Sequence, residues 1–180
     1  MQIKVLGASG GINAGIHTTA FLLDGDTLID AGTGACNLPL AVQQGIEQVF
    51  LTHAHLDHIV GLPMLAEGVL RHRMENDLPP IKVLELVPME VGSSIALSGG
   101  RFIEAIPAVH SVPSAGFAVH QGDDTWVFTG DTGRNPLLWQ FVSQLPRQGR
   151  SLRWLVTECT FADDDQAFAD LTGHYTAHSL

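Results

Sequence analysis

The 180-residue sequence is poor in positive charge. It has nine lysines and arginines against 19 aspartates and glutamates, and its formal net charge at pH 7 is -10. A protein that grips a long nucleic acid needs a basic footprint over the phosphates it contacts. The sequence contains no such basic cluster, so we predict that a long nucleic acid is not its partner. A small anion is compatible with this acidity if metal ions supply the positive charge.

Cysteines are scarce as well, with Cys36 and Cys159 as the two in the chain. Two thiols in different apolar settings do not make a disulfide framework, so free buried thiols are expected. Long apolar runs are missing, since none approaches the roughly 20 residues that cross a bilayer. The first residues, MQIKVLGASGG, lack the basic start and long apolar run of a signal peptide. These absences predict a cytoplasmic protein with no membrane partner.

The chain does contain enough apolar material for a core. Hydrophobic residues make up 45% of the sequence and charged residues 16%. This composition is typical of a globular protein rather than a disordered one. A chain of this length suits one domain, and no linker or low-complexity tract interrupts it. We therefore predict a single domain over residues 1–180.

The first half of the chain consists of short apolar runs that end in tight turns. Strands are expected over residues 3–6, 18–24, 27–32 and 48–53. An Asp24-Gly25 pair between the second and third strands predicts a hairpin turn. Asn37 is expected to cap a short helix over residues 38–44. A longer helix is expected over residues 62–73, before the segment DLPP stops it.

The second half repeats this order. Strands are expected over residues 101–110, 115–121, 125–133 and 153–161, with a helix from Asn135-Pro136 to about Leu145. Each half therefore has strands, a helix and then a strand that ends at polar residues. This repeat favours an α/β protein built as a four-layer αββα sandwich. Periodicity alone supports the α/β class but not the layer order. Between Val83 and Pro88, VLELVP passes abruptly from one strand-like run to another.

The segment LTHAHLDHIVGLP, residues 51–63, carries most of the chemistry. It places His53, His55, Asp57 and His58 within six positions where a strand is expected to end. In an extended segment the side chains at i and i+2 point the same way, so His53 and His55 face one side together. Imidazole and carboxylate groups are suitable ligands for zinc, manganese or iron. Two neighbouring metal ions would explain this density of ligands.

Four ligands are too few for two ions, so others must come from further strand ends. His110 ends an expected strand ahead of a loop rich in serine and proline, and Asp131 lies between glycines after another. Taken alone, His110 reads as an ordinary loop histidine and Asp131 as a turn residue. Their order after the histidine cluster is what indicates a shared site.

At these residues the chain resembles a known group. HAHLDH matches the H-x-H-x-D-H signature of the metallo-β-lactamase superfamily, and His110 and Asp131 follow in the order of its third histidine and bridging aspartate. Over nearly its whole length the chain resembles the class II type cyclic-nucleotide phosphodiesterases, at VLGASGG, TTAFLLDGDTLIDAGTG, THAHLDHIVGLP, HSVPSAGF, FTGDTG, ECTF and GHYTAHSL. It is similar to the tRNA 3′-processing endonucleases (tRNase Z) at HLDHIVGLP, ECTF and GH-x-T-A. The signature is specific for fold and metal site and much less so for substrate.

The resemblance implies two divalent metal ions, with zinc expected first and manganese or iron as alternatives. One ion would take His53, His55 and His110, the other Asp57 and His58, with Asp131 bridging the two. His174 matches the histidine that contacts phosphate or protonates the leaving oxygen in the phosphodiesterase branch. Asp57 would also orient the attacking hydroxide. Glu158 is a candidate for holding an imidazole in place, and reads equally as a surface residue. His17, His72 and His120 are assigned no role.

The function implied by the resemblance is metal-dependent hydrolysis of a small phosphodiester such as cyclic AMP, by a hydroxide that bridges the ions. One alternative is a tRNA 3′-end endonuclease, against which the acidic charge and the lack of a basic substrate arm count. Others are a thioesterase or lactonase of the same fold, and a sensing domain with a degraded site. Relatives suggest a homodimer.

The chain departs from the family pattern in two places. The superfamily usually has one more metal-binding histidine, on a strand beyond the GH-x-T segment, and this sequence stops at Leu180 without it. An incomplete chain, a replacement by His174 or His178, and an empty second site are competing explanations. The VLELVP junction, residues 83–88, lacks the longer segment that phosphodiesterases often carry. The two gaps together favour incomplete coverage of a natural chain.

Overall fold

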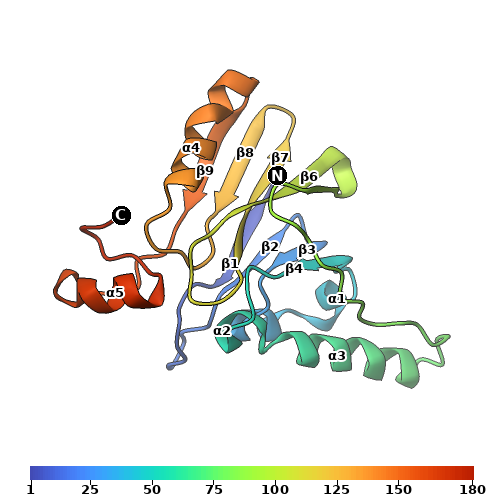
Figure 1. Cartoon of the computed structure of the whole chain (residues 1–180). Helices are drawn as coiled ribbons and strands as arrows, with labels where there is room; N and C mark the ends of the chain where they lie inside the picture. The colour runs from blue at the N-terminus through green and yellow to red at the C-terminus, as the bar shows by residue number, and fades with distance from the viewer. The chain divides into compact units, whose positions relative to one another are not determined.

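The computed structural model describes all residues, 1–180, and the chain divides into two compact units, residues 1–87 and 88–180. Each unit contains one β-sheet and its own helices (Figure 1). The prediction of an α/β protein with two sheets and helices is confirmed. The longest helix, α3 (Leu62–Glu75), has 14 residues, and none of the helices has the length and apolar character of a membrane span.

The first unit has a four-stranded sheet in the order β1 (Ile3–Gly7), β2 (Ala20–Leu23), β3 (Thr27–Ile29), β4 (Gln48–Phe50). The predicted hairpin turn is present: Asp24 and Gly25 both have positive φ, which aspartate tolerates and glycine adopts freely. β4 runs parallel to β3, whereas the other pairs are antiparallel. Because β3 and β4 are parallel neighbours, the residues after them leave the sheet at the same edge.

Helices follow these strands. They are the 3-10 helix η1 (Thr33–Asn37), α1 (Leu40–Gln43), α2 (Leu56–Ile59) and α3. The prediction that Asn37 caps a helix over residues 38–44 is wrong, because α1 begins after Pro39 and no side chain caps it. Leu38 precedes this proline and is extended, since proline disfavours helical backbone in the residue before it. Leu22, Leu28 and Leu65 are buried in the core of this unit.

The second unit has a five-stranded sheet. Its order is β5 (Ser94–Ala96), β6 (Arg101–Pro107), β7 (Ala115–Gln121), β8 (Asp124–Phe128), β9 (Ser151–Val156). β9 runs parallel to β8, and the other pairs are antiparallel. β6 and β8 end earlier than predicted, so His110 and Asp131 lie in the loops that follow them. Because β8 and β9 are parallel neighbours, the residues that follow these two strands leave the sheet at the same edge.

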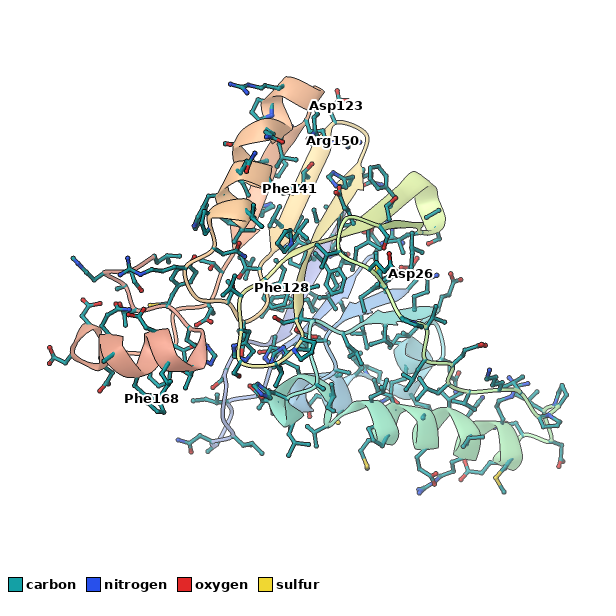
Figure 2. The ribbon with its side chains drawn as sticks, viewed as in Figure 1. Asp26, Asp123, Phe128, Phe141, Arg150 and Phe168 are labelled. Atoms are coloured by element: carbon teal, nitrogen blue, oxygen red, sulfur yellow. The ribbon has the colours of Figure 1, made fainter.

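Two α-helices of the second unit lie before and after β9 in the chain, α4 before it and α5 after it. α4 (Pro136–Gln144) begins where predicted, because the Asn135 side chain accepts a hydrogen bond from the Leu138 amide at 3.1 Å. Leu138 and Leu145 pack with Ile106 and Val127 of the sheet, and Phe141, labelled in Figure 2, packs against this cluster. The remaining helices are the 3-10 helices η2 (Ser98–Gly100), η3 (Leu145–Gln148) and η4 (Asp163–Asp165), and α5 (Gln166–Thr172).

Cys36 and Cys159 are free, as predicted, but both are exposed, so the prediction that they are buried is wrong.

Three differences from the sequence expectations concern short segments. Residues 78–90, which include VLELVP, form no strand, so the strand-like runs predicted there are wrong. β5 and α5 are present without having been predicted. Segments of three and seven residues are too short for a hydrophobic period to be recognised in the sequence.

Leu138 and Leu137 are neighbours on α4 that differ in burial, at 0% and 60% exposed. Leu138→Ala leaves a cavity against the sheet, and we expect the free energy of unfolding to fall by about 2–5 kcal/mol. Leu137→Ala is the matched control, for which we expect a change below about 0.5 kcal/mol. Urea denaturation followed by circular dichroism measures both. Equal losses for the two variants would contradict this packing of α4.

His120 of β7 is 1% exposed, and its ring stacks on Phe102 with centroids 4.4 Å apart. Burial lowers the pKa of His120 from 6.5 to about 4, and the positive charge of Arg150 adds to this effect. The nearest carboxylate, on Glu104, lies 3.6 Å from His120 Nε2, and burial raises the pKa of Glu104. Their attraction does not offset the cost of burying two charges, so the histidine stays neutral in the folded protein.

This shift predicts a pH-dependent stability. The unfolded chain binds a proton at His120 near pH 6.5 and the folded chain does so near pH 4, so stability is complete above the first value and falls toward the second. We expect a loss of about 2–3 kcal/mol from this group. Urea midpoints between pH 4 and 7 measure it. His120→Asn should flatten the profile, whereas replacing the exposed His178 by asparagine should leave the slope unchanged.

Candidate metal centre

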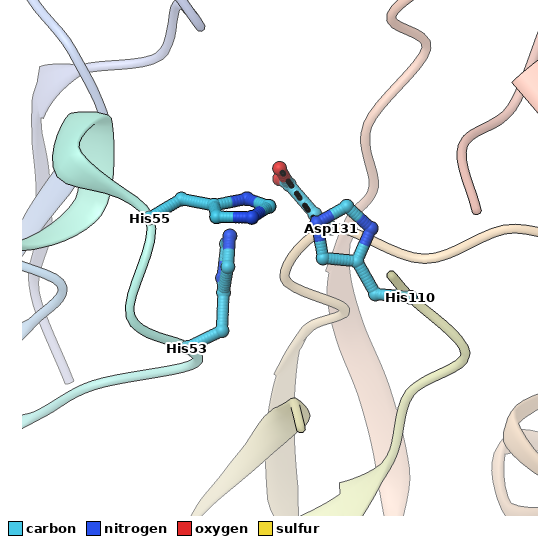
Figure 3. A group of neighbouring side chains, drawn as sticks. All are labelled: His53, His55, His110 and Asp131. Atoms are coloured by element: carbon cyan, nitrogen blue, oxygen red, sulfur yellow. Dashed lines mark ion pairs between the residues drawn. The ribbon is translucent and has the colours of Figure 1, made fainter. Parts of the chain in front are cut away.

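The loop after β4 and the short helix α2 that follows it gather four ligand-type side chains within the first unit, two from each. His53 and His58 are buried, and His55 and Asp57 are partly exposed. The rings of His53 and His55 meet edge to face with centroids 4.6 Å apart, and those of His53 and His58 lie 4.2 Å apart. Figure 3 shows His53 and His55 side by side. The i, i+2 spacing therefore places both imidazoles on one side, as predicted.

A buried carboxylate that sequence reasoning missed holds this loop. Asp30 follows β3, is 0% exposed and has a φ of 55°, which is uncommon outside glycine. It accepts hydrogen bonds from the Thr52 amide at 2.8 Å and from His58 Nδ1 at 2.7 Å. Burial raises the pKa of Asp30, and these bonds oppose part of that rise. The sequence signal that could have indicated this residue is the position of Asp30 at the end of the strand-like run TLID, residues 27–30.

Asp30 also decides which ring nitrogens can bind a cation. Because its carboxylate accepts from His58 Nδ1, the lone pair of His58 is on Nε2. The Thr52 hydroxyl donates to Asp30 at 2.9 Å and lies 3.0 Å from His53 Nδ1, so that nitrogen carries the hydrogen. His53 and His58 therefore both present Nε2 lone pairs.

The Asp57 carboxylate faces one of these nitrogens. Its Oδ2 lies 3.5 Å from His58 Nε2. Two atoms that both accept hydrogen bonds repel at this distance, and a cation between them converts the repulsion into attraction. The donor set of this loop therefore fits a divalent ion that takes nitrogen and oxygen ligands.

The second unit holds a similar pair. His110 donates Nδ1–H to the Gly173 carbonyl at 3.0 Å, which leaves its lone pair on Nε2. That atom lies 4.0 Å from Asp131 Oδ2, as the dashed line in Figure 3 marks. Gly173 allows the close approach, since it has a φ of +74° and an added Cβ would lie 2.8 Å from His110 Cα. This pair again presents nitrogen and oxygen lone pairs to a common point.

Glu158 connects this pair to His174. Its Oε1 accepts from His174 Nδ1 at 2.7 Å and from the Thr132 amide at 2.8 Å, next to Asp131. Its Oε2 accepts from the Thr160 hydroxyl. Since the Glu158 side chain is 9% exposed, it is not a surface residue and it holds an imidazole as the alternative interpretation proposed. The rings of His174 and His110 lie edge to face, with centroids 4.7 Å apart.

The predicted site residues thus form one group in each unit. The first unit gathers His53, His55, Asp57 and His58, and the second gathers His110, Asp131 and His174. His178 is exposed near the end of the chain. Asp30 and Thr52 support the first group, and Glu158 and Gly173 support the second.

Comparison with protein families identifies one family, described as the beta-lactamase superfamily domain, over residues 26–179. The chain belongs to this superfamily. Among curated proteins it is 27% identical to the nuclear ribonuclease Z of Triticum aestivum, over 61% of this chain and 73% of that protein. It is 29% identical to a chloroplastic tRNase Z of Arabidopsis thaliana, over 61% of this chain and 36% of that protein.

Solved structures of the superfamily have the same fold. The metallo-β-lactamase fold protein YhfI from Bacillus subtilis has a TM-score of 0.75 at 20% identity, covering 98% of this chain and 77% of YhfI. The short form of human tRNase Z has a TM-score of 0.71 at 20% identity, with coverages of 99% and 86%. Yeast PDE1 has a TM-score of 0.72 at 16% identity, with coverages of 98% and 79%. These likenesses confirm the predicted metallo-β-lactamase fold.

Membership in the beta-lactamase superfamily implies divalent metal ions, and the side chains fit them. In each unit a histidine Nε2 faces a carboxylate oxygen, at 3.5 Å for His58 and Asp57 and at 4.0 Å for His110 and Asp131. The opposite ring nitrogens of both histidines donate to protein oxygens, which fixes the orientation that a metal requires.

Replacing Asp30 tests this support. Asp30→Asn puts an amide donor where the carboxylate accepted, so His58 should shift its hydrogen to Nε2 and lose the lone pair that faces Asp57. We expect zinc affinity to fall by about 10–100-fold, measured by competition with a chromophoric chelator. Asp77→Asn, at an exposed turn, is the control and should bind zinc like the wild type. Unchanged affinity in a folded Asp30→Asn variant would show that this carboxylate does not orient the ligands.

Proposed function

We propose that this chain is a metal-dependent phosphodiesterase that hydrolyses a small phosphodiester such as a 3′,5′-cyclic nucleotide. The coarser class, a hydrolase of the beta-lactamase superfamily, follows from the family match. The observation that carries the finer proposal is the His174–Glu158 pair, which holds a proton-carrying imidazole beside the ligand-type residue His110.

We propose the ligands of the two ions that the family resemblance implies. His53, His55, His110 and Asp131 would hold one ion, and Asp57, His58 and Asp131 would hold the other. When bound, a pair of divalent ions supplies charge neutralisation of the phosphate and a deprotonated water near neutral pH. We propose zinc first, with manganese or iron as alternatives that the same ligands suit. The second ion would have three protein ligands and the first would have four, so we expect the second ion to bind more weakly.

Asp57 would orient the attacking oxygen as well as hold an ion. Its side chain is 24% exposed, whereas His58 beside it is 1% exposed, so the carboxylate is reached from solvent. A carboxylate in that position accepts a hydrogen bond from water and aligns it with the phosphorus atom. This double role makes Asp57 the residue whose loss affects both binding and turnover.

His174 would protonate the leaving oxygen. Its Nδ1–H donates to the Glu158 carboxylate at 2.7 Å, an arrangement that stabilises the positively charged imidazolium. The proton delivered to the substrate is then the one on Nε2. Glu158 is held by the Thr132 amide, so the histidine keeps a defined direction. General acid catalysis of this kind contributes about 10²–10⁴ in rate.

A second candidate function is an RNA endonuclease. The similarity to wheat and Arabidopsis proteins named ribonuclease Z and tRNase Z favours it. The net charge of -10 opposes it, because phosphate contacts with a long RNA need lysines and arginines. The expected homodimer and cytoplasmic location stay predictions, and sedimentation velocity on the metal-loaded protein checks the first.

Metal analysis coupled to substrate assays tests the proposal. We expect up to two ions per chain and metal-dependent turnover of bis(p-nitrophenyl) phosphate and cyclic AMP, with none of precursor tRNA. His174→Ala should lower kcat by about 10²–10⁴ and leave the metal content unchanged. Asp57→Ala should lower both, whereas His72→Ala on α3 should lower neither.

The same assays separate the alternatives. Cleavage of precursor tRNA without turnover of the small diesters would establish the endonuclease in place of the phosphodiesterase. Turnover of a thioester or lactone but of neither phosphate substrate would indicate another hydrolase of this fold. A metal-loaded protein that turns over none of them would contradict an enzymatic role.

A further inference from the structure

We propose, on the basis of the phosphodiesterase function above, that Phe161 and Phe168 form an aromatic wall that binds a planar aromatic group of the substrate. The wall is defined as these two side chains together with the ring of His174. It makes a nucleobase or similar aromatic group, carried on a small phosphodiester, the part of the substrate that sets specificity.

The first observation is an unbroken series of ring contacts inside the second unit. The His110 and His174 centroids lie 4.7 Å apart, those of His174 and Phe161 5.5 Å, and those of Phe161 and Phe168 5.2 Å. All three contacts are edge to face. A chain of contacting rings therefore runs from the candidate metal ligand His110, past the proposed general acid, to α5.

The second observation is exposure at the far end. Phe168, labelled in Figure 2 on α5, is 54% exposed. Phe161 is partly exposed. Phe168 contacts Phe161, which contacts His174. Exposing an aromatic ring to water is unfavourable, and a bound planar group would remove part of that cost, since stacking on aromatic rings stabilises bases of any sequence.

The third observation is the firm attachment of the wall. The Phe161 amide donates to the Tyr175 carbonyl at 3.2 Å, and the Thr160 amide donates to the same oxygen at 3.0 Å. Tyr175 is 1% exposed, and its hydroxyl accepts from the Asn135 amide at 3.2 Å. Because Tyr175 directly follows His174, the wall and the proposed general acid are fixed by the same buried residue.

The charge beside the wall favours a small substrate. The exposed residues Asp163, Asp164 and Asp165 form η4, between Phe161 and Phe168 in the chain. Carboxylates at this position repel the phosphates of an extended nucleic acid but not an uncharged base. The wall therefore fits the base of a mononucleotide-sized diester rather than a stretch of RNA.

Two inhibitors that differ by one aromatic group test the wall. AMP and ribose 5-phosphate share the sugar and phosphate, and only AMP carries a base. Equilibrium dialysis with the zinc-loaded protein should show AMP bound more tightly, and Phe168→Ala should weaken AMP by about tenfold while leaving ribose 5-phosphate unchanged. Phe168→Tyr keeps the ring and should retain AMP affinity. Trp154→Ala removes a 69%-exposed aromatic side chain elsewhere in the unit and is the matched control.

The outcomes keep this inference distinct from the proposed function. If bis(p-nitrophenyl) phosphate is turned over but Phe168→Ala weakens both inhibitors equally or neither, the wall does not bind the base and the inference is overturned. If the wild type turns over no phosphodiester, the proposed function fails first. A 20-nucleotide single-stranded RNA can be tested as a competitor for bound AMP. If, counted per phosphate group, the RNA displaces labelled AMP at a lower concentration than unlabelled AMP does, the preference for a small substrate is overturned.

Discussion

The buried carboxylate of Asp30 is the constraint on which the first half of the site depends. An ionised carboxylate in a dry environment is costly unless its oxygens are fully hydrogen-bonded, and here the Thr52 amide and hydroxyl and the His58 ring supply those bonds. The same bonds force His58 to present Nε2. One buried charge therefore determines both the path of the loop and the chemistry of its imidazole.

The second unit uses the same arrangement with different residues. In the first unit Asp30 follows β3, and the histidine cluster follows its parallel partner β4. In the second unit Glu158 follows β9, and Asp131 follows its parallel partner β8. In each sheet, a carboxylate that follows one strand of a parallel pair bonds to an imidazole. Candidate metal ligands follow the other strand of the same pair. Parallel pairing brings two carboxyl-terminal strand ends to one edge, and it requires a crossover, which contains η1 and α1 in the first unit and α4 and η3 in the second.

The beta-lactamase superfamily supports many chemistries on this framework, so the substrate depends on what surrounds the ligands. Acidic residues outnumber basic ones in the sequence, and those of η4 come shortly before the exposed Phe168 in the chain. The relatives by sequence are named ribonuclease Z and tRNase Z, whereas our proposal of a small substrate rests on the scarcity of lysines and arginines that could contact the phosphates of a long RNA. The combination explains why a small diester with an aromatic group is the substrate class that we propose.

The sequence by itself determined the class of fold, and it indicated His53, His55, Asp57 and His58 as candidate ligands because they are close in the chain and their spacing is readable from local geometry. It also indicated the helix start at Asn135, which a local side-chain bond creates. Only the tertiary structure decided the contacts of Asp30, of Glu158 and of the rings in the proposed aromatic wall. Their partners lie 28, 16 and 13 positions away, at Asp30–His58, Glu158–His174 and Phe161–His174. Contacts of that separation arise from strand pairing and burial, and no local pattern of residues encodes them.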